Sequence, residues 1–143
     1  MNFNKFTIKA QEAIQEAAKI AAANGQQAVE PVHILAGVIK SGEQIVSFLM
    51  QKSGASIKKI ELEANSIIRT LPKVSGGEPY LSRESTQIIS KAEETAKKNG
   101  DEFVSVEPIL LALLNESSSA STILKNNGIN KNDLEKAINE LRK

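Results

Sequence analysis

The sequence predicts an all-α fold of two tandem, pseudo-twofold-related copies of a four-helix unit, eight helices in all, forming one domain over residues 1–143. Three observations predict this fold. The chain matches itself at an offset of 75 residues, its apolar residues recur every three or four positions, and helix-capping residues stand at matching places in both copies. Copy one is expected at residues 6–71, a linker at 72–80 and copy two at 81–143.

The internal repeat needs no gap through the first half of each copy. The pairs that set the alignment are Asn24 with Asn99, Gly25 with Gly100, Val29 with Val104, Leu35 with Leu110 and Leu49 with Leu124. One residue is then deleted from copy two, so that Ile60 aligns with Leu134 at an offset of 74. Aligned residues should therefore occupy equivalent places in the two units.

The first helix of each copy starts at a hydroxyl, Thr7 or Ser82, because such an oxygen accepts a hydrogen bond from the free amides of the first turn. Its predicted buried face consists of small and aliphatic residues: Ala10, Ala13, Ile14, Ala17 and Ala21 in copy one, and Ile88, Ile89, Ala92 and Ala96 in copy two. The helix ends at Asn-Gly, where Gly25 and Gly100 can adopt the left-handed conformation that closes a helix.

The second helix of each copy is predicted at residues 32–39 and 107–114. Pro31 and Pro108 lie near its start, where a missing amide costs little. The helix is apolar on most sides, so it is expected at the centre of the core.

The third and fourth helices complete each unit. The third carries aliphatic residues around 45–49 and 120–124, and the fourth starts at Ser56 in copy one and at Asn130 in copy two. The linker at 72–80 contains proline and glycine, which interrupt helices. No segment alternates apolar and polar residues, so no β-strand is predicted.

The composition excludes several classes of function. The 18 Lys and Arg against 17 Asp and Glu leave a net charge of +1, without the basic excess that phosphate contacts demand, so no nucleic-acid partner is expected. The absence of cysteine excludes disulfides and sulfur-ligated zinc. Residues 1–7 lack the apolar core of a targeting signal, and no later stretch approaches the ~20 apolar residues that span a bilayer. We expect a soluble, cytoplasmic protein without a membrane partner, monomeric as an isolated domain.

No pattern for catalysis or nucleotide binding occurs in the chain. Phosphate-binding glycine-rich loops and the G-x-S-x-G elbow are absent, so this domain is predicted to have no catalytic residue, cofactor or metal. The single histidine, His33, aligns with Pro108, which cannot act as a base or ligand, so His33 is predicted to be structural. Adjacent carboxylates such as Glu93 and Glu94 lie on different faces of a helix and are predicted to be solvated.

The seam between the two copies is the predicted place for binding. First-turn residues of equivalent helices are expected to meet there, Thr7 with Ser82 and Val32 with Glu107. Helix starts offer free amides and a partial positive charge, so peptide groups or carboxylates could dock beside an apolar groove. The alternative interpretation is that Thr7 and Ser82 are only helix caps.

Three motifs carry a resemblance to a known family. They are Phe6-Thr7 at the start of copy one, Glu30-Pro31-Val32-His33-Ile34-Leu35 at its second helix, and Leu71-Pro72-Lys73-Val74 at its end. Over essentially the whole chain, this pattern resembles the Clp amino-terminal repeat domain. The Leu-Pro-x-Val motif before a glycine-rich linker, with residues 100–105 in copy two, is most similar to ClpB-type disaggregases.

The resemblance implies a non-catalytic, mobile substrate-binding domain of an ATP-dependent disaggregase. ATP and Mg²⁺ would be bound by ATPase rings located further along the chain. This domain would engage unfolded or aggregated polypeptides before they are threaded through the pore of the hexamer that the rest of the protein forms. In the family that this chain resembles, substrate contact is associated with three positions, which correspond here to Thr7, Asp101 and Glu107.

Two alternatives remain open at this stage. A ClpC- or ClpA-type domain would bind adaptors or read phosphoarginine with one glutamate in each repeat, but the matching residues here are Val32 and Glu107. Valine cannot pair with a guanidinium, which disfavours that alternative. The other is a free-standing adaptor or scaffold.

Overall fold

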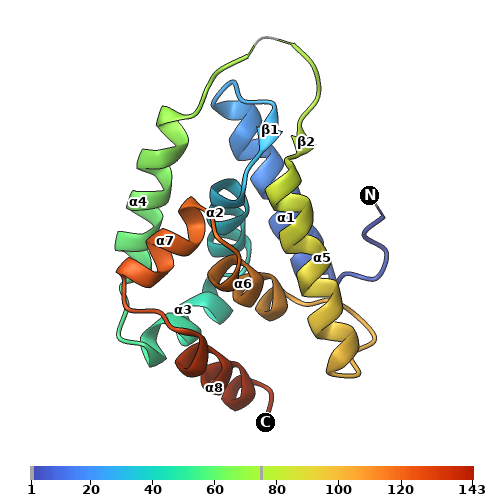
Figure 1. The fold of residues 1–143 in the computed structure, drawn as a ribbon, viewed down its shortest axis with the longest axis vertical. Coiled ribbons are helices and arrows are strands. Elements are labelled where there is room, and N and C mark those ends of the chain that lie inside the picture. Colours follow the sequence, from blue (N-terminus) through green and yellow to red (C-terminus); the bar gives the residue numbers. More distant parts are fainter. Residues whose placement is uncertain (1, 75) are drawn as a thin grey trace.

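The computed structural model describes residues 2–74 and 76–143. This part of the chain confirms the all-α prediction, with eight helices and two very short strands (Figure 1). In chain order the elements are α1 (Ile8–Ala23), β1 (Ala28–Val29), α2 (Pro31–Ser41), α3 (Glu43–Lys52), α4 (Ile57–Thr70), β2 (Tyr80–Leu81), α5 (Arg83–Lys98), α6 (Val106–Asn115), α7 (Ser119–Asn126) and α8 (Lys131–Leu141). Helices α1–α4 fall in copy one and α5–α8 in copy two; the boundaries of the copies stay a prediction.

The helix ends follow the capping residues of the sequence. Side-chain oxygens of four predicted caps accept a hydrogen bond from an amide of the first turn: Thr7, Ser56, Ser82 and Asn130. Gly25 and Gly100 have φ values of 68° and 75° just after α1 and α5, the left-handed conformation expected there.

The two strands correct the prediction that the chain has none. β1 and β2 pair in parallel, with Ala28 opposite Tyr80 and Val29 opposite Leu81, and a single parallel bridge joins Phe6 to Val104. Each paired segment is one or two residues long, too short to produce an alternating pattern in the sequence. Both pairings join one copy to the other.

The direction of the helices corrects the predicted seam. The amide of Thr7 donates to the Val104 carbonyl at 2.9 Å, and the amide of Ser82 donates to the Val29 carbonyl at 3.1 Å. The start of α1 therefore lies beside the segment before α6, and the start of α5 beside the segment before α2. In Figure 1, α1 and α5 run in opposite directions, so the start of α1 at Thr7 and the start of α5 at Ser82 lie at opposite ends of these two helices.

The second predicted pair is wrong for the same reason. Val106, at the start of α6, packs beside Gly42, at the end of α2, so α6 does not bring Glu107 to Val32 at the start of α2. A twofold axis perpendicular to the helices makes equivalent helices antiparallel. The N-terminus of one helix then lies near the C-terminus of its equivalent. Periodicity in the sequence carries no information on that direction.

Helices α2 and α6 form the centre of the core, as predicted. Every residue of α2 from Pro31 to Ile39 is buried. Gly37 lets α2 approach α1 closely, because a Cβ at this position would overlap the carbonyl oxygen of Ala13 and lie 2.9 Å from the amide nitrogen of Ala17. The α1–α2 contact is the most extensive between any two elements of the described chain.

Within residues 2–74 and 76–143, no single helix combines the length and apolar character needed to cross a membrane. The consecutive helices α2 and α3 meet these criteria only when taken together, and they are bent by 103° at the break between them.

Candidate functional site

Thr7 lies where α1 meets the segment that leads into α6. Its Oγ1 accepts a hydrogen bond from the amide of Ala10 at 3.1 Å, which caps α1. Its own amide is bound to Val104, and the amide of Val104 in turn donates to the Lys5 carbonyl at 2.7 Å. These backbone bonds hold Thr7 beside the loop that contains Asp101 and leads to Glu107 in the first turn of α6. The exposed apolar side chains of Ile8 (76%) and Phe103 (47%) flank this junction.

Asp101 and Glu107 share one partner, the guanidinium of Arg142 at the end of α8. Arg142 Nη1 lies 2.9 Å from Asp101 Oδ2, and its Nε lies 3.5 Å from Glu107 Oε2. Arg142 Nη2 donates to Ser105 Oγ at 3.2 Å. We call Asp101, Ser105, Glu107 and Arg142 the Arg142 cluster. Glu107 is nearly buried in it, whereas about a quarter to a third of the Asp101 and Arg142 side chains is exposed.

The structure thus brings the three predicted site residues into one region. Arg142 was missed by sequence reasoning, because its aligned residue in copy one is Ile68, an apolar position in the stripe of α4. No other signal in the sequence distinguishes Arg142 from a solvated helix end.

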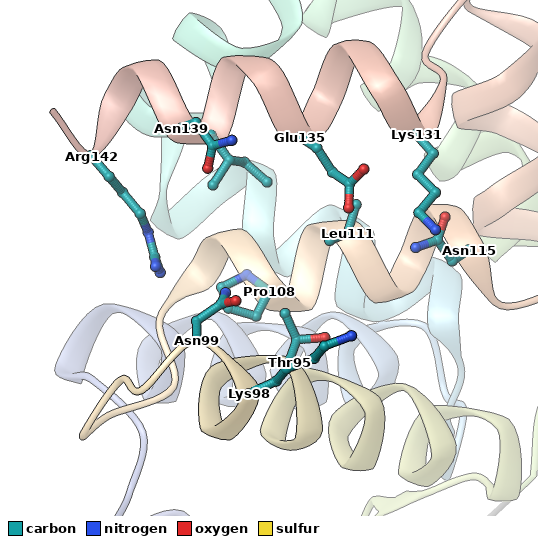
Figure 2. Close-up of a pocket in the computed structure, with 11 residues that line it drawn as sticks. Thr95, Lys98, Asn99, Pro108, Leu111, Asn115, Lys131, Glu135, Asn139 and Arg142 are labelled. Atoms are coloured by element: carbon teal, nitrogen blue, oxygen red, sulfur yellow. The ribbon is translucent and has the colours of Figure 1, made fainter.

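A cleft of about 530 Å³ opens next to the Arg142 cluster, between α5, α6 and α8 (Figure 2). Its lining residues come from α5 and the residue after it (Thr95, Lys98, Asn99), from α6 (Pro108, Leu111, Asn115) and from α8 and its cap (Lys131, Glu135, Ile138, Asn139, Arg142). Figure 2 shows Arg142 at one end of the cleft and Lys131 at the other. Arg142 therefore connects the cleft to two of the predicted site residues, Asp101 and Glu107, although none of the three predicted residues lines it.

The lining of the cleft combines two kinds of surface. Leu111 and Ile138 are half-buried and supply apolar contact, and the ring of Pro108 lies beside them. The amide side chains of Asn99 and Asn139 can each donate and accept hydrogen bonds, as an extended peptide backbone requires. Which apolar residues line the cleft could not be predicted, because helix periodicity does not separate a groove from a core.

In copy one, the place equivalent to the Arg142 cluster holds a buried, uncharged hydrogen-bond network. Gln26, the residue aligned with Asp101, donates from Nε2 to the carbonyl of Ile68 at 2.6 Å, and its Oε1 lies 2.7 Å from His33 Nε2. The amide of Glu30 donates to His33 Nδ1 at 2.9 Å, so the proton on the ring is on Nε2. Burial lowers the pKa of His33 to about 4. His33 is fully buried and bonded on both nitrogens, as expected of a structural residue.

Comparison with known proteins identifies the family. Residues 5–127 match the Clp repeat (R) N-terminal domain. The chain is 56% identical over 143 residues to chaperone protein ClpB of Bacteroides thetaiotaomicron and 46% identical to that of Porphyromonas gingivalis; all of this chain is covered, and it spans 17% of the length of each.

Solved structures share the fold, among them those of two N-terminal domains. The Hsp104 N-terminal domain of Candida albicans superposes with a TM-score of 0.85 at 25% identity, over 97% of this chain and 92% of that one. The N-terminal domain of ClpD from Arabidopsis thaliana gives a TM-score of 0.76 at 27% identity, over 100% and 98% of the two chains. With the family match over most of its length, the chain belongs to the Clp repeat N-terminal domain family, within which it resembles the ClpB chaperones of these two bacteria.

Proposed function

We propose that this chain is the substrate-binding domain of an ATP-dependent disaggregase, and that unfolded or aggregated polypeptides dock in the cleft between α5, α6 and α8. The observation that carries the proposal is the cleft itself, with its half-buried apolar residues and its amide side chains. Its volume of about 530 Å³ lies in the range of roughly 300–1,000 Å³ that is usual for ligand clefts. Asp101 and Glu107, two of the three residues that the family resemblance associates with substrate contact, are bound to Arg142, which lines the cleft. The third, Thr7, is held beside Val104, in the loop between them.

The proposal extends to the rest of the protein, because the chain spans only 17% of its ClpB relatives. ATP and Mg²⁺ would be bound by ATPase rings of a cytoplasmic hexamer, and this domain would be non-catalytic. Binding here should be weak, on the order of 10 µM or weaker, because ordering a disordered client opposes association. Weak binding also suits a domain that releases its client to a pore.

The first test is a nuclear magnetic resonance titration of the labelled domain with a permanently unfolded protein. Leu111→Ala should weaken binding about tenfold, since roughly 1.5 kcal/mol of apolar burial is lost. Leu62→Ala is the matched control, because Leu62 is a 61% exposed leucine on α4, which does not line the cleft. Equal affinities of the two variants, or shifts centred on Leu62, would contradict the proposed site.

A parallel titration with free phosphoarginine tests the ClpC-type alternative. Val32, one of the two positions that would read the mark, is 1% exposed and offers no carboxylate. We therefore expect no saturable shifts near Glu107. Saturable shifts there would favour the alternative, and silence toward both ligands would favour an adaptor for a folded partner.

Thr7→Ala should weaken client binding and lower the free energy of unfolding by about 1 kcal/mol, the usual cost of a lost N-cap. Ser82→Ala is the control, because Ser82 is the N-cap of the equivalent helix α5. It lies far from Thr7, beside Val29 in the segment before α2. The control substitution should cost about as much stability and leave client affinity unchanged. If both folded variants bind clients like the unmodified domain, Thr7 is only a cap.

A further inference from the structure

Each copy joins the loop after its first helix to the end of its fourth helix, but the two copies use different chemistry. In copy one, buried Gln26 donates to the carbonyl of Ile68. In copy two, the aligned residues are Asp101 and Arg142, which form a partly exposed ion pair. The same place in the fold is thus closed by a buried neutral bond in one copy and by charged side chains in the other.

The two closures differ in how easily they open. Separating Gln26 from Ile68 would leave buried polar groups without partners, which is costly. Separating Arg142 from Asp101 exposes two charged groups that water solvates readily, and salt screens their attraction. Only Glu107 is nearly buried, and its contact with Arg142 is the longer one, at 3.5 Å. The contact in copy two is therefore the weaker and more salt-sensitive of the two.

The last turn of α8 also lacks the apolar anchor that α4 has. Ile68, in the last turns of α4, is 2% exposed and belongs to the core. Its aligned residue in copy two is Arg142, and the neighbouring Ile138 and Leu141 are only half-buried. The fully buried residues of α8, Leu134 and Ala137, lie further toward its start. The end of α8 is consequently held by partly buried apolar contacts and by ion pairs, of which the Arg142 cluster is the one at the cleft.

We propose that Arg142 is a latch on the cleft. By binding Asp101, Ser105 and Glu107, it holds the end of α8 against the loop before α6 and the first turn of α6. Arg142 itself lies at one end of the cleft (Figure 2). Its release lets the end of α8 move away and uncovers Ile138 for an apolar client. Asp101 and Glu107 then affect binding through Arg142. The effect of Arg142 on client binding rests on the proposed function, whereas its effect on the mobility of α8 can be measured without any client.

Hydrogen exchange of the α8 amides tests the latch alone. Arg142→Gln should speed exchange in the last turn of α8 about three- to tenfold at low salt. Lys52→Gln is the matched control, because it removes a different ion pair of α8, between Lys52 and Glu140 at 3.2 Å, on the α3 side. It should change exchange less than twofold. Equal exchange in the two variants would overturn the latch, whatever the clients do.

Client titration then tests what the latch controls, with a permanently unfolded protein as the probe. Arg142→Gln should bind about threefold more tightly than the unmodified domain at low salt, and added salt should remove the difference. Asp101→Asn should have the same effect, and the double variant should add nothing to either single change. Weaker binding by Arg142→Gln, or additive effects, would overturn the proposal. Faster exchange without client binding by any variant would support the latch and contradict the proposed function.

Discussion

Gly37→Ala should lower the free energy of unfolding by about 3 kcal/mol or more, which is a large part of the stability of a domain of this size. The new Cβ would meet backbone atoms of Ala13 and Ala17, so relief requires α1 to move away from α2. The gain in helix propensity of about 1 kcal/mol does not offset this overlap. Urea unfolding followed by circular dichroism measures the difference.

The repeat provides the control for this variant. Ala112 in α6 aligns with Gly37, so copy two already carries the methyl group that copy one cannot hold. Ala112→Gly should cost only about 1–2 kcal/mol, from helix propensity and one lost methyl. A Gly37→Ala protein as stable as the unmodified domain would show that α1 and α2 are further apart than described.

Acidification from pH 7 to pH 4 should remove up to about 3 kcal/mol of unfolding free energy through His33. The pKa of His33 is lowered from 6.5 to about 4 in the folded protein. Between these values the unfolded chain binds the proton and the folded chain does not, so stability falls as the pH falls through this window. Protonation of Nδ1 would also break its bond from the amide of Glu30. Urea unfolding at pH 7, 5.5 and 4 measures the slope.

His33→Gln separates this effect from other titrations. The variant should be less stable at pH 7 by about 1–3 kcal/mol because the Gln26 network is disrupted, but its stability should depend little on pH between 6.5 and 4.5. Glu16, whose pKa is lowered by its hydrogen bond to Lys40, adds a loss of stability only below its usual value of 4.5. A slope that persists in His33→Gln would assign the pH dependence to other groups.

The helices could be predicted from sequence because each is specified locally, by apolar spacing and by caps such as Thr7 and Gly25. The arrangement of the two copies could not. Apolar spacing is the same whether two equivalent helices run parallel or antiparallel, so the expected meeting of Thr7 with Ser82 was wrong. The bridge between Phe6 and Val104 left no pattern, since it involves one residue on each side.

The candidate site was predicted in part. The choice of Thr7, Asp101 and Glu107 came from the family resemblance, and the structure brings their segments together; their contact with clients stays a proposal. Arg142 was hidden because the repeat relates it to a core residue, Ile68. Positions at which the two copies differ in residue type are therefore candidates for functional residues that the repeat alignment alone does not indicate.

The two inter-copy pairings have a consequence for how the domain holds together. Two short backbone pairings join the copies, one between β1 and β2 and one between Phe6 and Val104. An isolated copy would leave the backbone amides of these segments without their partners. A second identical copy would supply them, so the single chain has the architecture of a homodimer whose subunits have been fused end to end. Its halves should melt together as one cooperative unit.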